Sequence, residues 1–405
     1  RDSSTSRGLG DVYKRQQMKE LSKRTAGFTD SVIRRMTRIS NQYGAINLSQ
    51  GFPDFDPPKE ITDRLKKIAD SGPHQYALTW GAQNFREALA KKQEHFYGMK
   101  VDPDKELVVT CGSTEAMMAA MMSVCNPGDE VVIFSPFYEN YGADTILSGA
   151  EPIYVPLIPP TFSFDADRLE AAMKRDKVKA LILCNPSNPC GKVFTKEELE
   201  LIASLAIKYD IYVITDEVYE HIVYEPFQHI CIATLPGMRE RTIVCNSLSK
   251  TYSITGWRLG YVMAPAEIAD RVKKVHDFLT VGAAAPLMEA AVTGLCFDDS
   301  YYKGLQAHYT HMKELFTGGL DELGFTFTRP QGAYYVLMDI SEYGYSDDLL
   351  FCEDLARKVG VGAVPGSSFF KEPENRYIRF HFAKKDDTLE AALDRLADMK
   401  DKMKR

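Results

Sequence analysis

The chain has 405 residues, of which 44% are hydrophobic and 26% are charged, and its formal net charge is −7. These proportions are typical of a soluble globular protein with enough chain for roughly two to three domains. The acidic balance, 49 basic against 56 acidic side chains, argues against a nucleic-acid partner, and no basic stripe with interleaved aromatic residues occurs. No run of about 18 apolar residues occurs either, so we expect no membrane-spanning helix.

The eight cysteines are scattered, mostly in apolar runs, and no two of them form a Cys-x-x-Cys pair. This pattern favours buried free thiols in the reducing cytoplasm over a disulfide framework or a zinc site. His308 and His311 are spaced so that they could bind a metal, but no third ligand accompanies them. We therefore predict an exposed helix face there and no metal site.

Residues 1–17 are polar, rich in Ser, Arg and Gly, and lack periodicity. We interpret them as a non-native or disordered leader, with Met18 as the start. A targeting peptide is the alternative, although Asp2, Asp11 and the lack of an amphipathic pattern disfavour it.

From residue 30 onward, helical and strand-like segments alternate. The helical patterns of the first part of the chain are residues 30–42, 59–70, 83–96 and 115–124. The short β-branched runs are residues 46–48, 107–110, 130–134, 152–156, 180–184, 212–215 and 242–245, with 259–263 as a further candidate. This alternation predicts an α/β fold with a largely parallel sheet covered on both faces by helices.

After Pro286 the pattern changes to a long helical region that runs through Leu323. The segments that follow are a strand at 334–338, a helix at 347–359, a strand at 377–382 and a last helix that ends at residue 403. They predict a separate, smaller α+β domain that the N-terminal segment joins. The predicted division is residues 18–58 and 300–405 for the small domain and 59–299 for the large one.

The strongest chemical signal is Ser247-Leu-Ser-Lys-Thr-Tyr-Ser-Ile-Thr-Gly-Trp-Arg258, which follows an apolar strand. Lys250 can form an imine with an aldehyde, and Arg258 can bind a dianionic phosphate through its planar guanidinium. Pyridoxal 5′-phosphate (PLP) carries both groups. A surface loop with a solvated lysine is the alternative for this stretch alone. The stretch resembles the signature of the class I/II aminotransferases, which are fold-type I PLP-dependent transferases, and the resemblance extends in order over residues 30–403.

Polar motifs at other strand ends agree with this resemblance. Gly112-Ser113-Thr114 follows a strand and begins a helix, so its N–H groups and hydroxyls suit an anion, although a plain helix N-cap is the alternative. The resemblance implies that Ser113 and Thr114 form the phosphate site together with Ser247, Ser249 and Arg258.

Asp216 ends the apolar run 211–215, where a carboxylate could pair with the pyridine nitrogen of the cofactor and keep it protonated. Tyr219 lies three residues further on, within reach of the cofactor's phenolic oxygen. For Asp216, a helix N-cap is the alternative. The resemblance implies that Lys250, Asp216 and Tyr219 are catalytic.

Two further motifs lie at the ends of predicted strands. In Asn185-Pro-Ser-Asn188-Pro-Cys-Gly, the resemblance assigns Asn188 to the cofactor phenolate and places Asn185 near the substrate carboxylate; without it, the motif reads only as a turn. In Ser-Pro-Phe-Tyr138, it stacks Tyr138 on the cofactor ring, whereas a core aromatic is the alternative.

Arg379 lies in a strand-like run opposite Ile378 and Phe380, an unusual place for an arginine that has no partner. The resemblance implies that it binds the substrate α-carboxylate, with the backbone N–H of Gly51 assisting; an ordinary salt-bridge arginine is the alternative. It also implies a homodimer with shared active sites, in which Tyr76 reaches the phosphate of the partner subunit. Tyr76 could equally be a core residue of its own subunit.

The resemblance implies ping-pong transamination, with Lys250 as general base and then acid, between an amino acid and a 2-oxo acid. Within the family, the Gly51-Phe-Pro-Asp-Phe segment looks most like the kynurenine, glutamine, methionine and aromatic aminotransferases. Neither Thr114 nor the segment 280–286 supplies the cation that aspartate specialists use, so neutral, aromatic or sulfur-containing donors are expected. Arg34, Arg35 or Arg38 could still enter the site, and 2-oxoglutarate stays open as the acceptor.

Three rival functions remain at this point. A PLP-dependent C–S β-lyase would use nearly the same residues, and an aspartate aminotransferase would differ only in its side-chain pocket. A PLP-sensing half of a transcription regulator would need an N-terminal DNA-binding domain, for which the leader is too short.

Overall fold

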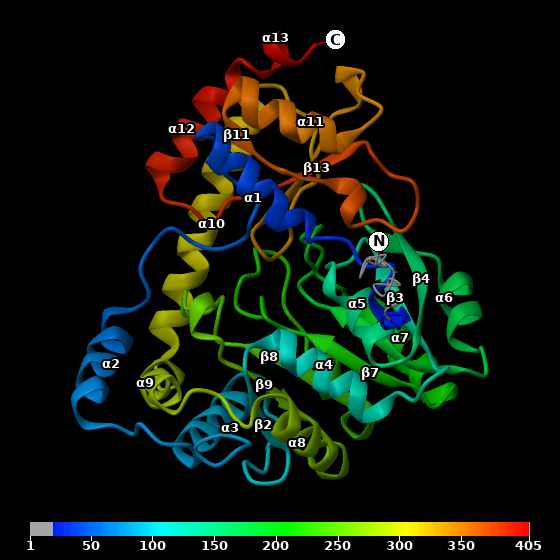
Figure 1. The fold of residues 1–405 in the computed structure, drawn as a ribbon, viewed down its shortest axis with the longest axis vertical. Helices are drawn as coiled ribbons and strands as arrows, with labels where there is room; N and C mark the ends of the chain where they lie inside the picture. Colours follow the sequence, from blue (N-terminus) through cyan, green and yellow to red (C-terminus); the bar gives the residue numbers. More distant parts are fainter. Residues whose placement is uncertain (1–18, 405) are drawn as a thin grey trace, which may run out of the picture.

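The computed structural model describes residues 19–404, so the predicted leader and its Met18 lie outside the described residues. An eight-stranded sheet forms the lower part of the molecule (Figure 1). In sheet order its strands are β2 (Leu107–Thr110), β9 (Gly260–Met263), β8 (Thr242–Ser247), β7 (Tyr212–Asp216), β6 (Val178–Cys184), β3 (Glu130–Ser135), β4 (Glu151–Ile158) and β5 (Ser163–Phe164). The strands β3, β4, β6, β7 and β8 are mutually parallel, whereas β9 is antiparallel to both of its neighbours. The predicted, largely parallel sheet is confirmed.

The sheet is buried on both faces, which explains why its strands are apolar at consecutive positions. Along β3, Val131 and Ile133 share a hydrophobic core with α4 (Ser113–Val124), α5 (Asn140–Leu147) and α8 (Ala266–Thr280). The alternate residues Val132 and Phe134 share another core with α6 (Ala166–Met173) and α7 (Lys196–Lys208). A third core joins the β2 end of the sheet to α3 (Gln83–Tyr97) and α9 (Ala285–Leu295), which packs on α2 (Lys59–Ser71).

The upper part of the molecule in Figure 1 contains two smaller sheets. Strands β10 (Tyr335–Asp339), β13 (Tyr377–His381) and β12 (Val364–Pro365) form one of them, and β1 (Ile46–Asn47) pairs in parallel with β11 (Val361–Gly362) in the other. Their core joins α1 (Val32–Tyr43) to α10 (Asp299–Glu322) and α12 (Asp386–Ala397). The N-terminal helix therefore lies with C-terminal elements, while the domain limits at residues 58 and 300 stay a prediction.

Three expected helices are divided. The region 286–323 forms α9 and α10, because the Asp298 side chain accepts a hydrogen bond from the Ser300 N–H and begins a new helix. The helix expected at 347–359 consists of α11 (Asp348–Asp354) and a π-helical turn (Leu355–Val359). The last helix is likewise two helices, α12 and α13 (Met399–Met403).

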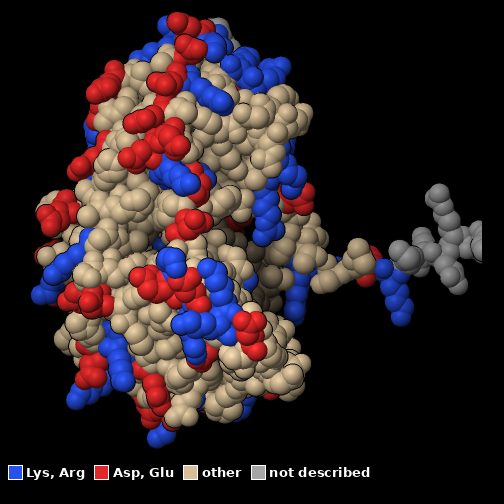
Figure 2. All heavy atoms as spheres, turned by 90° about the vertical axis from the view of Figure 1, so that its left-hand side faces the viewer, with Lys and Arg blue, Asp and Glu red and all other residues tan. Residues whose placement is uncertain are grey.

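The face seen in Figure 2 carries no extended field of charge of one sign. Among the described residues, no helix combines the length and apolar character needed to cross a membrane. Acidic and basic side chains are interspersed over that face (Figure 2). His311 lies on the exposed side of α10 and pairs with Asp386 at 2.8 Å, while the ring of the neighbouring His308 contacts Phe55.

Candidate active site

A cavity of about 900 Å³ lies beyond the carboxyl ends of the parallel strands, where open α/β sheets place their ligands. Its walls come from the strand ends of the large sheet, from the segment before and after β1, and from β13. All the residues predicted for the site line it except Tyr76 and Asn185. The predicted residues on its wall are Gly51, Ser113, Thr114, Tyr138, Asn188, Asp216, Tyr219, Ser247, Ser249, Lys250, Arg258 and Arg379.

Lys250 follows β8 and presents its amine to the centre of the cavity. Its Nζ donates a hydrogen bond to the carbonyl of Gly51 at 3.1 Å, and it lies 5.8 and 5.6 Å from the ring centroids of Tyr219 and Tyr334. Burial is the main reason why the pKa of Lys250 is lowered to about 8. The charges of Arg258 and Arg379 contribute to the lowering, and the Asp216 carboxylate opposes it. The amine therefore has a much larger neutral, nucleophilic fraction near neutral pH than an ordinary lysine, although the ammonium form still predominates at pH 7.

One end of the cavity is built for an anion. Ser113 and Thr114 begin α4, whose N–H groups and dipole favour negative charge, and Ser247, Ser249 and Arg258 lie at the same end. Gly112 has a φ of +84°, and a Cβ there would lie 2.1 Å from Nη2 of Arg258. Only glycine lets the guanidinium approach this turn so closely.

The opposite end of the cavity carries a buried acid, Asp216, at the end of β7. Its Oδ2 accepts a hydrogen bond from the Tyr141 hydroxyl at 2.7 Å, and its Oδ1 accepts one from the Val218 N–H at 3.3 Å. Burial raises the pKa of Asp216 to about 6, although the Tyr141 hydrogen bond counteracts this. A cationic N–H placed before it would hold the carboxylate ionised. Tyr141 is not among the residues predicted from the sequence; its spacing of three from Tyr138, which lies in the turn just before α5, is the signal that could reveal it.

The guanidinium of Arg379 is held in an orientation that suits a planar partner. It lies between the rings of Tyr335 and Phe369, 4.3 and 4.6 Å from their centroids. Nη1 donates to Oδ1 of Asn188 at 2.7 Å, Nη2 donates to the Ser49 carbonyl at 2.9 Å, and the buried Nε has no partner among the described residues. Such a pre-oriented guanidinium suits bidentate binding of a carboxylate.

Gly51 lies two residues after Ser49, whose carbonyl binds Arg379, and it contacts Lys250. Its carbonyl accepts hydrogen bonds from both Lys250 and the Tyr334 hydroxyl, the latter at 2.9 Å. A Cβ at this position would lie 2.2 Å from Oη of Tyr335, whose hydroxyl is 2.8 Å from that of Tyr219. Tyr334 and Tyr335, two residues of the site not predicted from the sequence, thus fix the segment that carries Gly51.

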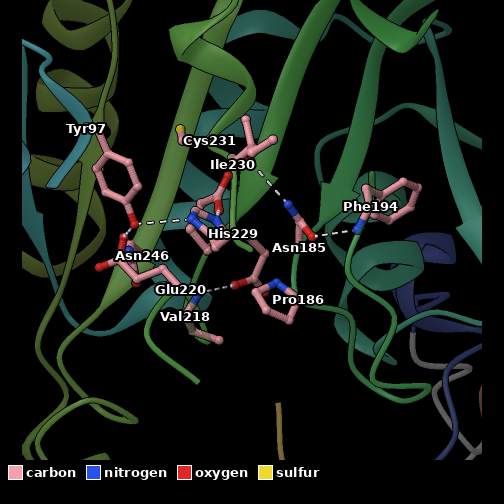
Figure 3. A network of polar contacts seen from close by, with 12 residues as sticks. Tyr97, Asn185, Pro186, Phe194, Val218, Glu220, His229, Ile230, Cys231 and Asn246 are labelled. Atoms are coloured by element: carbon pink, nitrogen blue, oxygen red, sulfur yellow. Dashed lines mark hydrogen bonds and ion pairs between the residues drawn. The ribbon is translucent and has the colours of Figure 1, made fainter. Parts of the chain in front are cut away.

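Asn185 was expected near the substrate carboxylate, but its side chain does not line the cavity. Its Nδ2 donates to the Ile230 carbonyl at 3.2 Å, and its Oδ1 accepts from the Phe194 N–H at 3.1 Å, as Figure 3 shows. Both polar ends are thus bound to backbone groups, so the side chain fixes the turn that positions Asn188. Tyr76 is 87% exposed, which excludes a place in the core of its own subunit.

A buried polar network lies behind the segment that follows Asp216 (Figure 3). The Glu220 carboxylate accepts hydrogen bonds from Lys92 and from the Tyr97 hydroxyl, each at 2.6 Å, and His229 contacts Glu217. Buried charges that are paired in this way hold a chain segment in one arrangement, because separating them would leave a charge uncompensated. The network fixes the backbone on which Asp216 and Tyr219 are carried.

These features fit PLP. An anion site, an amine of lowered pKa, a buried carboxylate and an orphaned guanidinium nitrogen match a phosphate, an aldehyde, a ring nitrogen and the carboxylate of an amino acid, respectively. The phosphate would be held by Ser113, Thr114, Ser247, Ser249 and Arg258.

The lowered pKa of Lys250 is testable in the cofactor-free protein. We expect labelling of this amine by an amine-reactive reagent, followed by mass spectrometry of its peptide, to rise with pH and reach half of its maximum near pH 8. In Asp216→Asn the midpoint moves to lower pH, because the carboxylate that favours the ammonium form is gone. A midpoint near 10.5, the ordinary value, in both proteins would contradict this environment.

Comparison with known proteins agrees with this geometry. The family model of the aminotransferases of class I and II matches residues 43–396. The methionine aminotransferase of Escherichia coli is 36% identical over 370 residues, which cover 91% of this chain and 96% of that protein. The probable N-succinyldiaminopimelate aminotransferase of Mycobacterium tuberculosis is 35% identical over 382 residues, with coverage of 91% and 96%. A crystal structure of E. coli YbdL, for which a methionine aminotransferase function was identified, superimposes with a TM-score of 0.90 over 94% of this chain and 99% of that one, at 35% identity. This chain is a member of the class I and II aminotransferases, a PLP-dependent enzyme of fold-type I.

Proposed function

We propose that this aminotransferase takes the α-amino group from a neutral amino acid with an aromatic, apolar or sulfur-containing side chain and transfers it to a 2-oxo acid by a ping-pong reaction. The composition of the cavity wall carries the proposal. Four basic side chains among the described residues line the cavity, and Lys250, Arg258 and Arg379 already have a place in the chemistry. The wall also includes Ile33, Phe52 and Tyr138, which suit an apolar side chain.

The residues of this chain divide the reaction among them. Bound PLP supplies the electron-withdrawing ring that makes the α-proton of an amino acid removable. Arg379 holds the substrate carboxylate, and this would fix the α-carbon near Lys250, whose neutral amine removes the α-proton and delivers it to the carbon that was the cofactor's aldehyde carbon. Asp216 holds a proton on the ring nitrogen, while Asn188 and Tyr219 bind the phenolic oxygen.

Arg34 is the arginine that supports a dicarboxylic acceptor such as 2-oxoglutarate. Of the three arginines considered from the sequence, Arg35 pairs with Glu353 at 2.7 Å and Arg38 lies 3.8 Å from Asp30. Arg34 instead lies on the cavity wall in the first turn of α1, a helix whose preceding Ser31 donates a hydrogen bond to Glu139 at 2.6 Å. Its place on the wall supports Arg34 as the partner of a distal carboxylate.

The donor is identified by the absorbance of the bound cofactor as single amino acids are added. We expect aromatic amino acids and methionine to convert the cofactor to pyridoxamine phosphate and to release one equivalent of the 2-oxo acid, whereas Lys250→Ala does neither. The conversion of aspartate alone would identify an aspartate aminotransferase. Release of pyruvate, ammonia and a thiol from a cysteine conjugate, with the cofactor still in its aldehyde form, would identify a C–S β-lyase.

The acceptor is tested by Arg34→Ala. Because the distal carboxylate loses a charged partner, we expect the KM for 2-oxoglutarate to rise by about tenfold or more, while the KM for a monocarboxylic 2-oxo acid changes little. Arg38→Ala serves as the matched control, since it removes a similar charge from α1 outside the cavity. Equal effects of Arg34→Ala on both acceptors would contradict this assignment.

We also propose a homodimer in which Tyr76 completes the partner's phosphate site. Tyr76 is exposed, and large apolar side chains near the cavity rim are exposed as well: Leu78 is 47%, Phe278 91% and Val281 48% exposed. Gly282 lies against Thr79, and Leu279 lines the cavity, so the exposed side chains border its opening. Burial of such a surface against a second copy would remove its apolar area from water.

The cytoplasmic location expected from the cysteines stays a prediction.

The shared site is tested by mixing two defective subunits. We expect sedimentation to show a dimer and Tyr76→Phe to weaken PLP affinity about tenfold, because a hydrogen bond to a charged phosphate is lost. A hybrid of one Lys250→Ala and one Tyr76→Phe subunit should regain one site of native affinity, in which Lys250 and Tyr76 come from different chains. A monomer, or unchanged affinity in Tyr76→Phe, would exclude the arrangement.

A further inference from the structure

A second acid, Asp144, lies at the Asp216 end of the cavity and has no part in the chemistry described so far. It follows Tyr141 by three residues on α5, so the two side chains share a face of the helix. Tyr141 donates its hydroxyl hydrogen bond to Asp216, and Asp144 lines the same cavity as Asp216. Asp144 is only 5% exposed, and its Oδ2 is buried without a partner among the described residues.

A buried carboxyl that lacks a donor holds its proton more tightly than one in water. Burial raises the pKa of Asp144 to about 7, and the negative charge of Asp216 contributes to the rise. Asp144 is therefore neutral below about pH 7 and charged above it. Because the pKa of Asp216 is about 6, a second negative charge arrives at this end of the cavity only as the pH passes through the neutral range.

The other ionisable groups around α5 are already engaged or lie elsewhere. Glu115 of α4 pairs with His276, and Glu130 of β3 pairs with Arg175. The remaining groups on the elements packed against α5 are Tyr154 and Glu151 of β4 and Lys23 and Arg24 of the turn Lys23–Thr25. Cys245 of β8 belongs to the same core, and burial, followed by the charges of Asp216 and Asp144, raises the pKa of its thiol. Asp216 is the charged group that acts on the pKa of Asp144.

We propose that Asp144 is a positioning residue for the cofactor ring: in its ionised form it adds to the charge of Asp216 and strengthens the hold on the protonated ring nitrogen. This inference rests on the assignment of Asp216 to the ring nitrogen under the proposed function. Binding of a cationic ring favours the charged form of a nearby acid, so binding releases a proton from Asp144 at pH values near 7 and below. The retention of pyridoxamine phosphate between half-reactions then strengthens as the pH rises through the pKa of Asp144.

The test compares two ligands and two proteins in one thermodynamic cycle. The ligands are pyridoxamine phosphate and its analogue with C–H in place of the ring nitrogen, which presents no charge to the two acids. The Kd of each is measured calorimetrically with the full-length cofactor-free protein and with Asp144→Asn, which keeps the shape of the side chain. The coupling is the ratio of the two Kd ratios, so the titration of the free ligand cancels.

We expect a coupling of about fivefold or more at a pH of about 8.5, falling toward unity at a pH of about 5.5, where Asp144 is protonated in the native protein. Calorimetry in buffers of different ionisation enthalpy should also show less proton release for Asp144→Asn than for the native protein at a pH of about 6.5. If Asp144 only fills space, the variant weakens both ligands equally and the coupling is unity at both pH values, which would overturn the inference.

Two further variants separate the possible failures. Glu139→Gln removes a carboxylate of the same cavity at the start of α5 and should give a coupling near unity. Asp216→Asn should give a large coupling at both pH values. A coupling for Asp216→Asn but none for Asp144→Asn would refute the role of Asp144 alone, whereas no coupling for either would refute the placement of the ring nitrogen at Asp216.

Discussion

The structure depends on one constraint, the burial of a lysine amine and an aspartate carboxylate in the same cavity without a direct bond between them. Burial shifts the pKa of Lys250 down to about 8 and that of Asp216 up to about 6. Burial thus favours the uncharged form of each group. For Lys250 this is the form that a covalent nucleophile needs, whereas a cationic ring nitrogen beside Asp216 would return that acid to its charged form. The remaining features of the site keep these two groups in place.

The eight-stranded sheet supplies the positions. Parallel strands end at one edge, so β7 ends at Asp216 beside Cys245 of β8, β8 runs on to Ser247, and the loop after β8 returns Lys250 to the same edge. The smaller sheet adds the proposed substrate clamp, because β13 carries Arg379, whose guanidinium lies against two aromatic rings and donates to Asn188. Glycines at positions 51 and 112 are required where side chains approach the backbone more closely than a Cβ would permit.

Residues of the candidate site were predictable from the sequence where the local pattern of apolar and polar residues is strong. Asp216, Asn188 and Tyr138 follow apolar strands at the edge where ligands bind, so their place in the cavity was predictable. The role of Asn185 was not, because two asparagines that each precede a proline look alike, and only the fold shows that one is occupied by backbone groups. Tyr141 and Asp144 lie on an eight-residue helix with a weak pattern. The two-residue strands β11 and β12 are too short to show an alternation at all.

The distribution of the site along the chain also sets the order in which it can be assembled. The last strand of the eight-stranded sheet ends at Met263, so every residue from Ser113 to Arg258 that we propose to bind the cofactor precedes that point. The hydrogen bond between Arg379 and the Ser49 carbonyl instead closes a loop of 330 residues. Contacts over such long separations form late, since the entropy of loop closure must be overcome first. During synthesis, the edge of the large sheet can thus take shape before Arg379 is in place, and the proposed ability to hold an amino acid by its carboxylate is acquired last.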